Sequence, residues 1–432
     1  MTMKKLLYLS FILTVFIGTR TQAQKAPTRE VSSEANLAKG SLVRIVGANR
    51  KLNIKSWDQS KVKVSVTFAY DSATKYTSQE ETMEALGISM KPFSNRVDIL
   101  ANRSSKLSSL EPLTVVGYQK KAASPDGRNA AEMAYVDALV ATTRSADRTG
   151  YGSAGRTMLK LSTTSIISLD IMVPAGSKLD IDNQYGDVVI GMNLDEAKLD
   201  ISNGALDMQD VKKLELTGKY CNANFGNIEN AEIEFQNGTL HAQNIADLDL
   251  DSKYSTIEFE KGKYLYLRSQ ADNISIDEID KVEGRKTYGS VRIDMLNGNF
   301  DLEGNNVDIK IRNINPQVEM IKINNKYGDV RLPVKSLKNY FVDFTGYYSA
   351  VFTPFPKTIV QEEEKKREDN NADLEEKKVE LVELAQAGEY YRTSSTLAGE
   401  MAPKRFTGTV GDISGKHTRF QLTCHSCTVD FK

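Results

Sequence analysis

The chain is poor in the residues that most often carry metal or redox chemistry. Its 432 residues include only three histidines and three cysteines. His241, His417 and His425 form neither an HExxH motif nor another paired spacing, so no histidine-based metal site is predicted. No nucleophile or phosphate-binding motif stands in a setting where it would work either. We therefore expect a protein that is not an enzyme and that has no cofactor.

A surplus of one charge sign is also missing. The sequence holds 56 basic and 57 acidic residues, which gives a formal net charge of -1. Proteins that bind nucleic acid gather a basic surplus on one face. Nucleic acid is therefore not an expected partner.

Long apolar runs are absent after the N-terminus. Residues 1–23 combine a basic start, MTMKK, with the apolar run LLYLSFILTVFIG and a small-residue ending at Ala23. That pattern predicts a cleaved signal peptide, and the run is too short to span a bilayer. We expect an exported protein of the periplasm, cell surface or extracellular space, with no transmembrane segment after cleavage.

A short phrase recurs along most of the chain. An apolar residue, any residue and a second apolar residue precede a polar corner, and a similar apolar pair follows it. The first apolar residue after the corner recurs at intervals of 18, 17, 17, 17, 17, 17 and 16 residues, at Val188, Leu206, Ala223, Leu240, Ile257, Ile274, Val291 and Val307. A fixed period of this kind predicts a stacked repeat fold.

The spacing within each unit predicts β-strands, because residues two apart share one face of a strand. Ile257 and Phe259 should thus point inward and Glu258 outward. Two strands of about five residues and two corners account for about 17 residues per coil. A coil can bury its inward residues only by stacking on neighbours about 4.8 Å away. The predicted fold class is all-β, a single β-solenoid with two irregular insertions.

The corners are predicted to come in two lengths. Six residues separate Ile181 from Val188, but only four separate Ile201 from Leu206. Short corners hold Asn and Gly, which accept positive φ, and alternation of the two kinds predicts a serrated edge. The longer corners hold tyrosines, at Tyr185, Tyr220, Tyr254, Tyr288 and Tyr327.

Two interpretations of these tyrosines remain open. Equivalent corner residues can stack on one another and fill the edge of the coil. Alternatively, the rings form a ladder that binds carbohydrate or another surface. We favour the first role, because a motif that recurs in many coils is more often required by the fold than by binding.

The domain prediction follows the rhythm of the repeat and its interruptions. It has a signal peptide at 1–23, an N-terminal β segment with opening coils at 40–104, a loop-rich insertion with a short helix at 105–160, solenoid repeats at 161–360, a charged insertion that is disordered or helical at 361–404, and the final solenoid coil at 405–432. In the opening coil, Leu52 and Ile54 should form one strand and Val62, Val64 and Val66 the next.

Cys424 and Cys427 form a CxxC in the last predicted corner. A redox motif would need a helix N-terminus to lower a thiol pKa, and this pair lies on a strand corner. We favour a local disulfide over two free thiols. Zinc would need two further ligands, for which only His417 and His425 lie near, so no metal is predicted.

Several of these stretches resemble a known family. They are VPAGSKLDIDNQYGDVVIG from Val173, LDLDSKYSTIEFEKGKYLYL from Leu248 and IKINNKYGDVRLP from Ile321. They are similar to the "putative adhesin" family of exported Bacteroidetes proteins, which has no established function. The resemblance covers residues 40–102, 165–355 and 405–432. It implies a β-solenoid, a cell-envelope or surface location and adhesion, and it offers no catalytic residues.

The sequence therefore predicts an exported, non-catalytic adhesin-like or scaffold module, whose partner is an envelope polysaccharide or a surface protein. The alternative is a polysaccharide-binding or polysaccharide-active β-helix protein of the lyase or hydrolase kind. Such an enzyme needs carboxylates clustered with Lys or Arg on one face, whereas the outward acids are scattered along this sequence.

Overall fold

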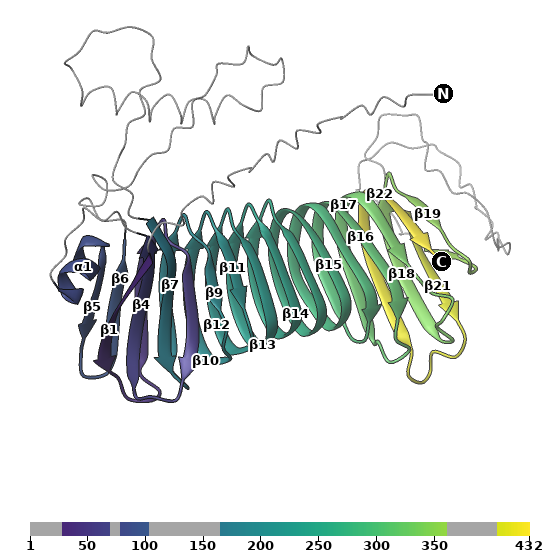
Figure 1. Cartoon of the computed structure of the whole chain (residues 1–432). Helices are drawn as coiled ribbons and strands as arrows, with labels where there is room; N and C mark the ends of the chain where they lie inside the picture. Colours follow the sequence, from purple (N-terminus) through teal and green to yellow (C-terminus); the bar gives the residue numbers. More distant parts are fainter. Residues whose placement is uncertain (1–27, 70–77, 103–164, 361–403) are drawn as a thin grey trace, which may run out of the picture.

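The computed structural model describes residues 28–69, 78–102, 165–360 and 404–432. These residues form one elongated stack of β-coils with one short helix, α1 (Gln79–Ala85), at one end (Figure 1). The predicted all-β solenoid is confirmed. Within these ranges, no helix is long and apolar enough to cross a membrane. The predicted signal peptide, the predicted insertion at 105–160 and residues 361–403 lie outside the described ranges.

Ten consecutive strands make the middle of the stack, and some of them continue from one face of a coil to the other. They are β8 (Lys178–Gln184), β9 (Val188–Ile190), β10 (Leu194–Ser202), β11 (Ala205–Met208), β12 (Val211–Lys219), β13 (Asn222–Gln236), β14 (Thr239–Lys253), β15 (Thr256–Leu296), β16 (Phe300–Ile314) and β17 (Met320–Leu332). Each coil has a strand on a first face, a corner, a strand on a second face and a return arc. Neighbouring coils pair in parallel, as where Leu240 lies between Ala223 and Ile257.

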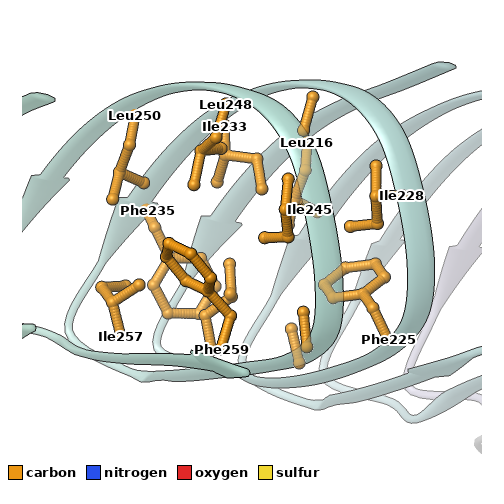
Figure 2. Close-up of a cluster of buried hydrophobic side chains, with 14 of the residues drawn as sticks. Leu216, Phe225, Ile228, Ile233, Phe235, Ile245, Leu248, Leu250, Ile257 and Phe259 are labelled. Carbon is orange, nitrogen blue, oxygen red and sulfur yellow. The ribbon is translucent and has the colours of Figure 1, made fainter. Parts of the chain in front are cut away.

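The core is the inside of the coil, where alternate side chains of the two faces meet (Figure 2). Leu216 and Leu250 come from the first face, Ile257 and Phe259 from the second, and each is at most 3% exposed. Glu258 between the last two is exposed, so the predicted inward register is confirmed. Each buried side chain of this size contributes about 1.5–3 kcal/mol, and stacking is what makes that burial possible.

All the corners have one length, contrary to the prediction of two. Ile201 pairs with Asn183, and not with Ile181. The last inward place of the first face is apolar in some coils and polar or glycine in others, which made equal corners look unequal. Val307 shows the same effect, since it pairs with Gly289 in the corner while Ile309 pairs with Val291.

The N-terminal end departs from the simple order of coils. Its strands are β1 (Thr28–Asn36), β2 (Leu42–Ala48), β3 (Leu52–Trp57), β4 (Lys61–Ala69), β5 (Ile88–Pro92), β6 (Arg96–Ala101) and β7 (Ser165–Pro174). β2 lies between β6 and β8 on the first face, and β3 lies between β7 and β9 on the second. β4 turns back antiparallel to β7, and β1 lies antiparallel on β4.

The prediction for the opening coil is therefore wrong about which strand precedes the corner and which follows it. Leu52 and Ile54 lie after the corner, paired with Val188 and Ile190. The strand before that corner is β2, and the valines of β4 belong to the antiparallel cap. All of these side chains are buried as expected; only their place in the coil differs.

At the C-terminal end, the last segment of the chain is inserted into the stack. The strands here are β18 (Tyr340–Tyr347), β19 (Ala350–Phe352), β20 (Thr358–Val360), β21 (Lys404–Val410) and β22 (Thr418–Phe431). β22 pairs with β17 on one side and with β18 and β19 on the other. The predicted final coil is thus last in sequence but not last in space. β21 and β20 continue the first face antiparallel beyond β18.

Candidate binding site along the corner edge

One edge of the solenoid is made of the corners that lead from the first face to the second. We call this row of corners the corner edge. Each corner has one residue in the left-handed region, with φ between 50° and 58°. In spatial order these residues, the rungs of the edge, are Asn49, Tyr185, Asn203, Tyr220, Asn237, Tyr254, Ala271, Tyr288, Asn306, Tyr327, Ser426 and Tyr348.

Left-handed backbone suits asparagine and is unfavourable for tyrosine. The conformation costs about 1–2 kcal/mol for an ordinary L-residue, and Asn tolerates it because its short side chain bonds locally. Six of the rungs are nevertheless tyrosines. The glycines beside Asn203 and Asn237 are needed because a side chain has no room there, and not because of a positive φ. A Cβ at Gly238 would lie 2.0 Å from the carbonyl oxygen of Cys221 in the previous coil.

The tyrosine rings lie on the outside. The exposed fractions are 60%, 62%, 57%, 52%, 49% and 56%, for Tyr185, Tyr220, Tyr254, Tyr288, Tyr327 and Tyr348. Tyrosines occupy every second rung, so their Cα atoms are about 9.6 Å apart, twice the roughly 4.8 Å between strands. That separation exceeds the reach of ring stacking, which ends near about 7 Å between centroids. The rings do not fill the edge by stacking on one another.

The rungs alternate through the inserted C-terminal strand as well. Tyr327 and Tyr348 are successive tyrosine rungs along the sequence, but β22 lies between their coils and places Ser426 between them. His425 of the same strand contacts both rings, with centroid distances of 5.6 Å to Tyr327 and 5.7 Å to Tyr348. The alternation is therefore a property of the folded surface.

The outer positions beside the rungs carry amides, hydroxyls and lysines. From Ser202 to Asn306 they are Ser202, Ala205, Lys219, Asn222, Gln236, Thr239, Lys253, Thr256, Gln270, Asn273, Thr287, Ser290 and Asn305. No aspartate or glutamate occurs among them, whereas the equivalent places beside Tyr185, Asn306 and Tyr327 hold Asp187, Asp308 and Asp329. This stretch of the corner edge is thus an aromatic and hydrogen-bonding surface that is neutral to weakly basic.

A buried polar cluster lies inside the same edge, behind the rung Ala271. The Asp272 carboxylate accepts hydrogen bonds from Ser252 Oγ at 2.7 Å, Ser269 Oγ at 2.5 Å and the Ser255 amide at 2.6 Å. The Lys286 ammonium donates to Ser269 Oγ at 2.8 Å and to the Asp272 carbonyl at 2.7 Å. Burial lowers the pKa of Lys286 to about 8, and the charge of Asp272 opposes this shift.

This serine, aspartate and lysine set has the residue types of a nucleophilic site, but its position favours a structural role. Asp272 is 0% exposed and Lys286 1%. A catalytic serine must reach its substrate, whereas these hydroxyls are used in holding the buried charges. Sequence reasoning missed the cluster. The available signal was the register, since Lys286 stands in KTYGS five residues before the inward Val291, where other coils hold an uncharged residue such as glycine, serine, asparagine or an apolar residue.

A shallow groove of about 490 Å³ crosses the outward side of the first face. Its lining includes Lys213, Glu215, Asn230, Glu232, Asp247, Asp249, Tyr264 and Tyr266. Glu215, Glu232 and Asp249 come from three neighbouring coils in register. The outward acids that looked scattered in sequence are thus gathered into a row. Ion pairs of Lys198 with Glu215 and of Arg268 with Asp249 flank it.

Cys424 and Cys427 are free thiols, so the predicted disulfide is not formed. Both point into the coil and are buried. A hydrogen bond with Cys427, together with burial, raises the pKa of Cys424. The Cys427 thiol donates to the Asn325 carbonyl of the neighbouring coil at 3.3 Å, which directs it across the stack.

Cys221 occupies the equivalent inner place of another corner, where burial raises the pKa of its thiol to about 11. In the part of the chain that the structure describes, no three His, Cys, Asp or Glu side chains group so as to hold a metal ion.

These features define a non-globular class of protein: a capped β-solenoid that presents continuous outer surfaces. Within that class, the profile of the Toastrack DUF4097 family matches residues 162–384, and the chain belongs to this family. The resemblance drawn from the sequence is confirmed at the level of the family, to which no function is assigned.

Further comparisons add little. No curated protein matches the chain. A structure from Parabacteroides distasonis named as a "putative lipid binding protein" is 10% identical, covers 69% of this chain and 94% of its own, and has a TM-score of 0.29. One from Clostridium sporogenes named as a "putative cell adhesion protein" is 8% identical, with 94% and 99% covered and a TM-score of 0.16. Both similarities are too weak to transfer a property.

Proposed function

We propose that this protein is an exported, non-catalytic adhesin-like or scaffold module that acts at the cell envelope or surface. The observation that carries the proposal is the corner edge, which repeats one exposed tyrosine-bearing surface over successive coils. A long surface of this kind suits a polymer or a partner protein better than a small molecule, which binds in a concave pocket. Export is supported by the signal-peptide pattern of residues 1–23.

The proposal is tested on the purified mature protein. It is incubated with envelope polysaccharides, peptidoglycan fragments and whole cells, and both retention and released product are measured. We expect retention on an envelope component without release of product. Turnover of any of these polymers would contradict the proposal.

A polysaccharide-active protein is the second candidate, and the row of acids in the first-face groove favours it. Two carboxylates about 5–10 Å apart can cleave a glycosidic bond, and residues of neighbouring coils come within such distances. The exchange Glu232→Gln separates the two candidates. If released product disappears in this variant while the melting temperature is unchanged, the enzyme is the better description.

A further inference from the structure

We propose that the corner edge binds an extended, β-linked polysaccharide chain that lies along the stacking axis, with the tyrosine rings contacting alternate sugar residues. This inference rests on the proposed function and deepens it by naming the polymer and its site. Tyr185 and Tyr348 are the outermost tyrosine rungs. Ten strand spacings separate them, which makes a straight track of about 48 Å.

The first step is that folding does not account for the tyrosines. Each ring is attached to backbone that is unfavourable for it, and the alternate rungs show that asparagine fills the same place. The tyrosines bury only part of their surface in return, since each is about half exposed or more. Strained positions persist in proteins chiefly where function requires them. The outward rings are therefore the part of the corner that the fold leaves unexplained.

The second step is the match of spacing. The rings repeat at about 9.6 Å along a straight line. In an extended chain of β-1,4-linked pyranoses, every second sugar presents the same face, and the disaccharide repeat has a similar length. A flat sugar face packs against a tyrosine ring, whose phenol group also offers a hydrogen bond.

The third step is the chemistry beside the rings. Amides such as Asn222 and Gln236 and hydroxyls such as Thr256 both donate and accept, as sugar hydroxyls require. The stretch from Ser202 to Asn306 carries exposed Lys219 and Lys253 and no acid in its outer positions. Along the whole track, Lys219, Lys253 and Lys326 are balanced by Asp187, Asp308 and Asp329, so the corner edge suits a neutral glycan.

The test compares oligosaccharides that differ in linkage and length, by titration calorimetry with the mature protein. Cellohexaose represents a straight β-linked chain and maltohexaose a curved α-linked one. We expect binding of cellohexaose and at least about tenfold weaker binding of maltohexaose, a difference of about 1.4 kcal/mol. Cellotetraose, which spans two rings instead of three, should bind more weakly than cellohexaose.

The triple variant Tyr220→Asn, Tyr254→Asn, Tyr288→Asn removes three successive tyrosine rings. It places asparagine, the residue found at several of the alternate rungs, at each of these positions. It should fold at least as well as the parent and lose cellohexaose binding by at least about tenfold. The Tyr→Phe exchanges at the same rungs should retain most of the binding. Phe93→Asn, at an exposed aromatic outside both the corner edge and the first-face groove, is the matched control and should bind as the parent does.

The result that overturns the inference is unchanged cellohexaose binding in the triple Asn variant, equal binding of the two linkages, or no binding of the β-linked chains. If the parent still binds envelope material without product release, only the inference on the corner edge fails. Product release from any polymer would instead remove the proposed function.

Discussion

The inside and the outside of the corner edge follow different rules. Inside, space and hydrogen bonding decide the residue: Gly238 has no room for a Cβ, and the buried charges of Asp272 and Lys286 are held by several hydrogen bonds. Outside, Tyr220 and Tyr254 are exposed on backbone that suits asparagine better. The interior is explained by the fold, whereas the exterior carries residues that the fold does not require.

The largest effect is expected from a charge placed inside the coil. Ile257→Asp would bury a carboxylate without a partner, which should lower the free energy of unfolding by more than about 4 kcal/mol. Glu258→Lys, one residue away but outward, should change it by less than about 0.5 kcal/mol. Urea unfolding of both variants measures this. Equal effects would contradict the inward register.

Breaking the polar cluster inside the corner should have the next largest effect. Lys286→Met leaves the Asp272 carboxylate buried without the lysine charge, at a cost of about 3 kcal/mol. Adding Asp272→Asn removes the second charge and should recover part of the loss, because no ion is then buried. Denaturant midpoints of the single and double variants give the coupling. Strictly additive losses would show that the two residues do not act as a pair.

The same lysine predicts a dependence of stability on pH. Burial lowers its pKa from 10.5 to about 8 in the folded state. Between these values the unfolded chain binds more protons, so this group makes folding more favourable as pH rises, by up to about 1.4 kcal/mol per unit. The stability of the parent relative to Lys286→Met should therefore rise between pH 8 and 10. A difference in stability that stays constant or falls over this pH range would mean that burial does not lower the pKa of Lys286.

The period of two in the sequence was sufficient to predict the strands and their inward residues, because it reflects only local alternation. The position of each corner within its coil could not be predicted from this alternation alone. Val307 looks like the first inward residue after a corner because it is apolar, yet it fills an inner corner place where most other coils hold Gly, Ser or Cys. The cluster around Asp272 was missed for the same reason, since its members meet only when the coils are aligned with their corners in register.

The order of the coils at the two ends could not be predicted from local patterns. Every coil presents the same backbone edge and a similar apolar interior, so β22 can stack as well between β17 and β18 as after β18. Its phrase FQLTCHSCTVDF fits the repeat in either place. The order is decided by long-range packing, including the contact of Phe420 with Tyr340 at 6.0 Å between ring centroids.

The smallest effect tests the outside of the corner edge. Tyr254→Asn replaces a left-handed tyrosine with the residue that best tolerates this backbone, so stability should stay equal or rise by up to about 1 kcal/mol. Tyr266→Asn is the matched control, because Tyr266 is a strand residue of β15, where tyrosine is favoured and asparagine disfavoured by up to about 1 kcal/mol. The two exchanges should therefore differ in sign or size when thermal melts are compared. A loss at Tyr254 as large as that at Tyr266 would show that the ring supports the fold, and the difference between the two sides of the corner would disappear.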